Sequence, residues 1–191
     1  MDIEIIVFVG IVAAAIVVFY FIQRSRKQAW SGLAAQTGLA FEGIGLFSQA
    51  RVTGMYRGRN IVLETFTTGG KNSKICTRVV ASVANASSIR LKLGEEGILA
   101  KIGKKMGGQD IQTGDAALDR RFLIKGEPEA EIRSLLLASD VRQRLLSLPQ
   151  LSVEVNGGEI RYEQYAFEKN AKRLQEVFDL LCVLGEGIEK K

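Results

Sequence analysis

Three aspartates, Asp110, Asp115 and Asp119, form the best carboxylate cluster of this sequence. The last two are four residues apart, so a helix would present both on one face, where they could bind a hard cation such as Mg²⁺. The structural alternative is that Asp115 caps a short helical turn while Asp119 pairs with Arg120 or Arg121. Capping is the commoner use of this spacing, which is not a metal-binding signature, so we predict no metal site.

Residues 68–73, TGGKNS, share features with the end of a phosphate-binding loop, in which glycines let backbone N–H groups approach phosphate and a lysine reaches the terminal phosphates. The match fails at two points. Thr65 occupies the position of the first glycine, and Asn72 separates Lys71 from the hydroxyl side chain. We therefore interpret this segment as a turn between two strands, and we expect no bound cofactor.

The composition excludes a good deal of catalysis because the chain contains no histidine. Ser-His and Cys-His nucleophile pairs are ruled out, and so are metal centres that depend on imidazole. The two cysteines, Cys76 and Cys182, lie within apolar patterns and form no CxxC motif, which is typical of buried reduced thiols. No complete catalytic motif is present, and we predict that the protein is not an enzyme.

Basic residues exceed acidic ones over most of the chain. The formal charge is +5, and because only two residues of the first 22 are charged, both acidic, the remainder carries 26 basic against 19 acidic side chains. A membrane surface explains this surplus more simply than nucleic acid does, since each Lys or Arg near anionic headgroups gains about 1 kcal/mol. We therefore expect no nucleic-acid partner.

Two groups of cations stand out within this basic surplus. They are Arg24, Arg26 and Lys27 in one group and Lys101, Lys104 and Lys105 in the other. Together they predict a surface that faces anionic headgroups or an acidic partner. The alternative, which stays open, is that they are solvated helix faces, as most runs of charge are.

The N-terminal segment is the clearest feature of the sequence. Ile5 to Ile22 reads IIVFVGIVAAAIVVFYFI, eighteen residues without a charge or a proline. At 1.5 Å per residue a helix of this length nearly matches a hydrocarbon core of ~30 Å. A cleavable signal peptide would begin with basic residues, and a core helix of a soluble domain is rarely apolar all round. We predict a transmembrane helix, with residues 1–22 as the anchor.

The charges that flank the predicted anchor give its direction. Asp2 and Glu4 precede it, whereas Arg24, Arg26 and Lys27 follow it at once. The positive-inside rule then places the N-terminus outside and the C-terminal part of the chain in the cytoplasm.

Other residues near the predicted anchor have candidate roles in contacts with lipid or protein. We expect Tyr20 and Trp30, together with the three cations that lie between them, at the membrane interface. Trp30 is expected either to pack beside the membrane or to anchor a partner. Gly10 and Ala14 form a pair of small residues four positions apart, which can bring another helix close.

Beyond the anchor we predict a juxtamembrane helix over residues 23–38 and a single domain over residues 39–191. Apolar periodicity and turn residues predict strands at 51–56, 60–67, 75–83, 88–93, 120–125, 151–155 and 159–165, and helices at 95–106, 128–137, 140–148 and 168–184. Arg57-Gly58-Arg59, between the first two of these strands, has the size and composition of a hairpin turn. The Asn-Gly-Gly sequence at 156–158 indicates the clearest hairpin. Hairpin-linked strands, with helices that do not alternate with parallel strands, indicate an α+β fold in which helices pack on one face of a mainly antiparallel sheet.

The segment Gly114 to Leu148, GDAALDRRFLIKGEPEAEIRSLLLASDVRQRLLSL, resembles a block found in bacterial membrane-anchored proteins that are grouped as domains of unknown function. In those proteins a Gly-Asp and a second Asp precede a strand of Arg/Phe type and a helix that ends near a leucine-rich stretch. This sequence departs from the group by having Leu118 where an aromatic residue is usual, and by having one membrane span. The resemblance implies a bacterial inner-membrane protein and implies no activity.

Three functional hypotheses follow. The first is a non-enzymatic accessory, assembly or scaffolding protein of a bacterial membrane complex, whose partners would be the lipid bilayer and another membrane protein. The second is a membrane-surface module that binds lipid or another ligand through its basic residues. The third is a metal-dependent hydrolase built on the three aspartates.

Overall fold

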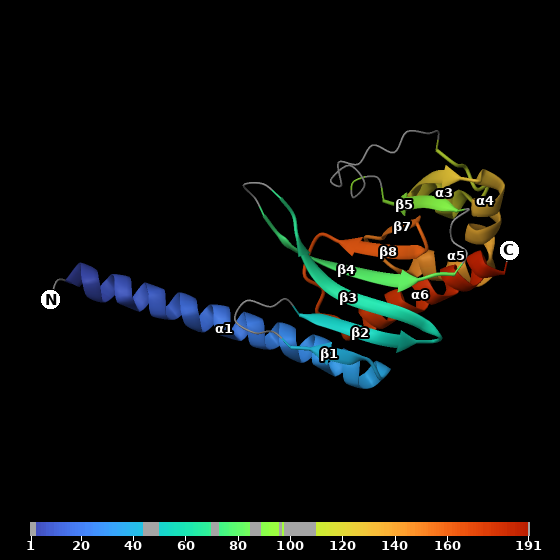
Figure 1. Ribbon diagram of the computed structural model, residues 1–191. Helices are drawn as coiled ribbons and strands as arrows, with labels where there is room; N and C mark the ends of the chain where they lie inside the picture. The colour runs from blue at the N-terminus through green and yellow to red at the C-terminus, as the bar shows by residue number, and fades with distance from the viewer. Residues whose placement is uncertain are drawn as a thin grey trace.

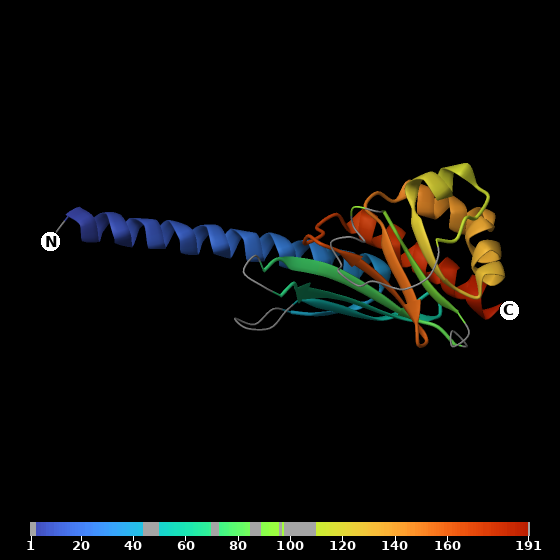
Figure 2. The same cartoon turned by 90° about the horizontal axis from the view of Figure 1, so that it is seen from above.

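A computed structural model describes residues 3–43, 50–69, 73–84, 89–95, 97 and 110–190 of this chain. Within these residues, one long N-terminal helix leads into a sheet of eight strands, and further helices cover one face of that sheet (Figures 1 and 2). Every strand pair is antiparallel. The fold is therefore α+β.

The elements follow one another along the described parts of the chain. They are α1 (Ile3–Thr37), β1 (Ala40–Glu42), β2 (Arg51–Tyr56), β3 (Arg59–Thr67), β4 (Ile75–Ser82), β5 (Arg90–Gly94), α3 (Ala116–Arg121), β6 (Leu123–Glu127), α4 (Glu129–Leu137), α5 (Ser139–Ser147), β7 (Ser152–Asn156), β8 (Glu159–Gln164) and α6 (Ala171–Glu189). The strand order across the sheet is β1-β2-β3-β4-β8-β7-β5-β6. The β7–β8 hairpin thus lies between strands that precede it in the chain.

Two predicted hairpins are confirmed, and both owe their tight turns to residues with positive φ. Between β2 and β3 these are Arg57 and Gly58, with φ of 48° and 77°. Between β7 and β8 they are Gly157 and Gly158, with φ of 61° and 85°, while Asn156 is the last residue of β7. Two-residue loops with positive φ at both positions match the twist of antiparallel strands, which fixes the register of each pair.

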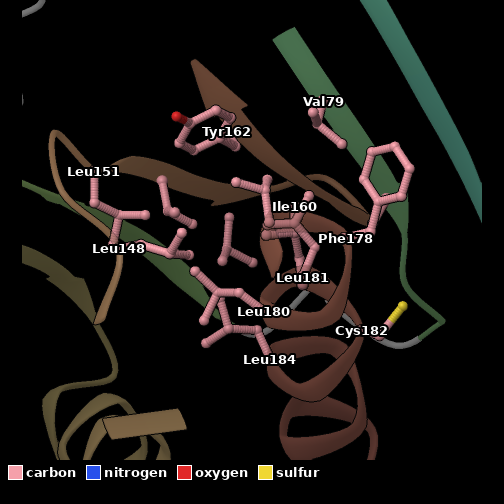
Figure 3. Packing of buried hydrophobic residues seen from close by; sticks show 14 of the residues in the cluster. Val79, Leu148, Leu151, Ile160, Tyr162, Phe178, Leu180, Leu181, Cys182 and Leu184 are labelled. Carbon is pink, nitrogen blue, oxygen red and sulfur yellow. The ribbon is translucent and has the colours of Figure 1, made fainter. Parts of the chain in front are cut away.

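Helix α6 forms the centre of the core. Its apolar face, including Phe178 and Leu181, is fully buried and lies against side chains of β4 and β8 such as Val79 and Ile160 (Figure 3). Alternate residues of the strands point toward this helix layer, as the period of two requires. Each large apolar side chain buried in this way contributes about 1.5–3 kcal/mol, so this layer dominates the stability of the domain.

Helix α1 joins two different environments in one element. Its C-terminal half packs on the domain and buries Trp30, Leu33 and Ala34. Gly38, with φ of 71°, ends the helix in the left-handed conformation that glycine adopts at low cost. The N-terminal half projects away from the sheet and the other helices (Figure 1). The predicted boundary at residue 22 therefore coincides with no helix end.

The prediction of a transmembrane anchor requires correction. In the part of the chain that the structure describes, no helix meets the combined requirements of length and apolar character for crossing a membrane. By this criterion the predicted N-terminal transmembrane helix is wrong, and so are the single-pass topology and the inner-membrane localisation that followed from it. The apolar run and the charged residues after it belong to one continuous helix of 35 residues.

Candidate functional site

The exposed apolar side chains of the domain and of α1 are distributed very unevenly. Of the twelve large hydrophobic residues found exposed among the described side chains, nine lie on α1 and three, Met55, Ile75 and Leu137, are scattered over the domain. We define the apolar segment of α1 by those nine residues, Val7, Phe8, Ile11, Val12, Ile16, Val17, Val18, Tyr20 and Phe21. Exposed apolar residues concentrated in this way mark an interaction surface, whereas single ones need no explanation.

The predicted helix-packing residues, and Tyr20 among the predicted interfacial residues, lie within the range of this segment. Gly10 and Ala14 are exposed, and a Cβ atom added at Gly10 would meet nothing within 4 Å. The ring of Tyr20 is also exposed and meets that of Phe21 edge to face, with centroids 6.0 Å apart. Packing of Gly10 and Ala14 against another helix stays a prediction.

Trp30 lies in the core and not at a surface. Its side chain is fully buried and stacks on Phe167, with ring centroids 5.0 Å apart and planes inclined by 16°. Its indole N–H donates a hydrogen bond of 2.9 Å to the carbonyl oxygen of Glu168. Of the roles that the sequence left open, packing is the one that the structure supports. The signal that could have identified it is the spacing of Trp30, Leu33 and Ala34 on one face of the helix.

The segment that Trp30 contacts is itself fixed to the sheet. Residues 165–170, which we call the β8–α6 connector, follow β8 directly. The hydroxyl of Thr77 in β4 donates to the carbonyl of Ala166 at 3.0 Å and accepts from the N–H of Glu168 at 2.8 Å. Thr77 is fully buried, so these bonds also satisfy its own hydroxyl. The contact of Trp30 with this connector therefore fastens α1 to the sheet and to α6.

The three cations that follow the apolar segment differ in their surroundings. Arg24 and Lys27 are exposed, whereas Arg26 is half-buried. The guanidinium carbon of Arg26 lies 4.7 Å from the centroid of the Phe167 ring, on which Trp30 also stacks. This contact with Phe167 was not predicted from the sequence, because it joins residues far apart in the chain.

Asp115 stabilises the start of α3 and links this helix to α5. As the N-cap of α3, its side chain accepts hydrogen bonds from the N–H groups of Ala117 and Leu118, at 2.9 and 3.1 Å. Its other carboxylate oxygen lies 2.6 Å from Nε of Arg142 in α5. The hydrogen bond from Arg142, followed by the one from the Leu118 N–H, lowers the pKa of Asp115 from 3.8 to about 2. The capping interpretation of Asp115 is confirmed.

Asp119 faces the same turn from within α3. It accepts hydrogen bonds from the N–H and the hydroxyl of Thr113, at 2.8 and 2.7 Å, and from the N–H of Gly114 at 3.0 Å. Desolvation raises the pKa of Asp119, but these hydrogen bonds outweigh it and the net pKa is lowered. The predicted pairing of Asp119 with Arg120 or Arg121 is replaced by this backbone contact. The resulting helix occupies residues 116–121 and so includes the first two residues of the strand predicted at 120–125.

Asp110 lies apart from this turn, with its carboxylate 3.8 Å from Nζ of Lys125 in β6. Across the described residues, no group of three or more potential ligands is arranged to hold a metal ion. The three aspartates are therefore not brought together into one cation site.

The stability of the fold is expected to respond to acid through Asp115. Because its folded-state pKa is lowered from 3.8 to about 2, its contribution is complete above pH 3.8 and is lost as the pH falls toward 2. The difference in thermal midpoint between the wild type and Asp115→Asn should shrink as the pH is lowered from neutrality to about 2. Asp140→Asn, at an exposed carboxylate of α5, is the matched control. A difference that stays constant with pH would contradict the role of Asp115.

Two remaining candidates can be placed only in part. Lys101, Lys104 and Lys105, the helix predicted over 95–106 and the centre of the TGGKNS turn fall largely or wholly outside the described residues, so the predicted basic surface stays a prediction. Cys76 and Cys182 are free and buried, and burial raises the pKa of both thiols. Neither thiol has the lowered pKa of a reactive cysteine.

A polar hollow with a volume of about 400 Å³ lies beside α5 and α6. Its lining residues are Asp140, Gln143, Arg144, Ser147 and Glu176. The guanidinium of Arg144 also lies 3.6 Å from the carboxylate of Asp179 in α6. Arg144 is therefore already engaged by a carboxylate of the domain.

No family model and no curated protein matches this chain, so the resemblance of Gly114 to Leu148 to a bacterial family stays a prediction. Among solved structures, the chain is similar to the crystal structure of the mycobacterial trehalose monomycolate transport factor A, TtfA. The TM-score is 0.55 and the sequence identity is 12%, over 87% of this chain and 93% of that one. At this identity the likeness shows a common fold.

Proposed function

We propose that this protein is a lipid-binding module whose apolar segment of α1 contacts lipid acyl chains. The observation that carries the proposal is the concentration of nine exposed apolar side chains on the projecting half of one helix. Transfer of each such side chain from water to an apolar phase is worth about 1.5–3 kcal/mol when complete. Acyl chains are the partner that matches a helix exposed on all sides, because they adapt to its surface without a shaped groove.

The similarity of fold to TtfA is a second observation that supports the proposal. TtfA is named as a transport factor for trehalose monomycolate, and this chain shares its fold over most of its length. A fold alone does not carry an activity, so the apolar segment carries the proposal and the fold likeness only supports it. The proposal shares lipid binding with the second of the three hypotheses from the sequence, but it assigns the contact to the apolar segment rather than to basic residues.

The other two hypotheses have less support. A metal-dependent hydrolase would need its aspartates free to bind a cation, but Asp115 and Asp119 are engaged in capping and in backbone contacts. An accessory role in a membrane complex depends on a protein partner of α1 or of the domain, and it stays a prediction. Neither hypothesis accounts for the apolar segment as directly as lipid does.

The fastening of α1 gives the domain a defined place relative to bound lipid. From Val7 to Phe21 the helix advances about 21 Å at 1.5 Å per residue. Beyond it, the stacking of Trp30 on Phe167 joins the same helix to the β8–α6 connector. The domain therefore moves with the lipid-contacting helix rather than on a flexible tether.

The test is flotation of the full-length chain with phosphatidylcholine vesicles. The double variant Ile11→Glu/Val18→Glu places two carboxylates in the apolar segment and is expected to lower vesicle binding about tenfold or more, because two favourable transfers become unfavourable. Met55→Glu/Leu137→Glu makes the same changes at exposed apolar residues of the domain and should leave binding unchanged. Equal losses in the two double variants, or no binding of the wild type to either neutral or anionic vesicles, would overturn the proposal.

A further inference from the structure

We propose that the lipid bound by this protein carries an anionic headgroup, and that Arg24, Arg26 and Lys27 bind its phosphate. This inference rests on the proposed function and adds the chemical class of the lipid. It is carried by three observations: the position of these cations next to the apolar segment, their lack of carboxylate partners in the described structure, and the contact that holds Arg26 in place.

Along α1 an apolar stretch is followed by cations, in the same order as the acyl chains and the phosphate of a phospholipid. The apolar segment ends at Phe21, and the first cation, Arg24, follows three residues later, about 4.5 Å further along the helix axis. Arg24, Arg26 and Lys27 then fall within little more than one turn. A lipid whose acyl chains contact the apolar segment would place its phosphate beside these cations.

These cations also differ from most arginines of the domain. Arg78, for example, lies between two carboxylates, 3.5 Å from Glu64 and 2.8 Å from Glu163. By contrast, Arg24, Arg26 and Lys27 form no ion pair with any carboxylate among the residues that the structure describes. Positive charge that is not neutralised within the domain remains available for an anion.

Arg26 has the geometry of a pre-positioned phosphate ligand. Its guanidinium lies over Phe167 at 4.7 Å, while Trp30, one turn further along α1, stacks on the same ring. Its Nε atom is buried and forms no hydrogen bond among the described residues. A guanidinium held over an aromatic ring has already lost part of its rotamer freedom, so less entropy remains to be lost when its terminal nitrogens donate to phosphate.

The alternative is that the three residues are only a solvated face of α1. If they were, each of them would contribute no more to a preference for anionic over neutral vesicles than any other exposed arginine does. Arg120 in α3 provides that comparison, because it is exposed and forms no ion pair with a described residue. Helix α3 lies at the end of the domain away from the N-terminal half of α1 (Figure 1).

The experiment compares binding of the full-length chain to vesicles of phosphatidylcholine alone and to vesicles in which part of it is replaced by phosphatidylglycerol. The ratio of the two affinities measures the anionic preference. Lys27→Gln and Arg26→Gln are each expected to lower this ratio about fivefold, as removal of one lysine or arginine near a charged lipid surface does. Arg120→Gln should leave the ratio unchanged, and raising the salt concentration should reduce the ratio for the wild type.

The outcomes separate this inference from the proposed function. Binding to both kinds of vesicle with equal affinity would overturn the anionic preference while leaving lipid binding intact. Binding to neither would overturn both. Equal losses of anionic preference in Arg120→Gln and Lys27→Gln would overturn the assignment of the phosphate contact to α1. Lys27 is exposed, so its replacement tests the charge without disturbing the packing of Arg26 on Phe167.

Discussion

Replacement of Trp30 by alanine is expected to destabilise the protein by about 3–5 kcal/mol. Trp30 is fully buried, so the change leaves a large cavity between α1 and the β8–α6 connector. It also removes the ring that stacks on Phe167 and leaves the carbonyl of Glu168 without its donor. The domain would then lose the contact that fastens α1 to it.

Urea-induced unfolding of the full-length chain, followed by circular dichroism, measures this loss. Fluorescence is unsuitable because Trp30 is the single tryptophan of the chain. Trp30→Phe, which keeps a ring but loses the indole N–H, is expected to be destabilised by less than the alanine variant. Gln36→Ala, at an exposed position of the same helix, should change the free energy of unfolding by no more than about 0.5 kcal/mol. An alanine variant at position 30 as stable as the wild type would mean that α1 is not part of the folded domain.

Gly126→Ala is expected to cost about 3 kcal/mol or more, because the new methyl group has no space. Gly126 lies in β6 directly opposite Leu91 of β5 and has φ of 156°. A Cβ atom at this position would overlap the backbone carbonyl oxygen of Arg90 and would lie 2.7 Å from Cδ1 of Ile132. The carbonyl belongs to the strand ladder, so it can move aside only if the pairing of β5 with β6 is disturbed.

Gly32→Ala is the matched control for this substitution. Gly32 is exposed on α1, and an added Cβ there would meet no atom within 4 Å. Alanine favours the helix by about 1 kcal/mol over glycine, so this variant should be as stable as the wild type or more stable. Urea unfolding of both variants checks the pair. A similar free energy of unfolding for Gly126→Ala and Gly32→Ala would contradict the close approach of β6 to β5.

Features that depend on neighbouring residues could be predicted from the sequence. The β2–β3 and β7–β8 hairpins follow from strand periodicity and from turn residues that accept positive φ. Capping by Asp115 was recognised because the acceptor and the N–H groups it satisfies are within three residues. In each case the interacting groups are close in the chain, so residue type and spacing contain the information.

Two predictions from local sequence patterns, the start of the strand at residue 120 and the membrane anchor, were wrong because each pattern fits more than one structure. Residues 120 and 121 belong to α3, although the pattern predicted a strand from residue 120, because Asp115 and Asp119 together stabilise the helical turn. The apolar run of α1 predicted a membrane anchor by its length and composition alone. In the part of the chain that the structure describes, α1 does not meet the combined requirements of length and apolar character for crossing a membrane.

The sequence by itself determined the α+β class, most strands, the hairpins and the absence of histidine chemistry, since these depend on composition and on short-range periodicity. Only the tertiary structure decided the strand order, in which the β7–β8 hairpin lies between β4 and β5. It also decided the burial of Trp30 and the contact of Arg26 with Phe167. These contacts join residues more than a hundred positions apart, and which of many apolar side chains meet depends on how the whole core packs.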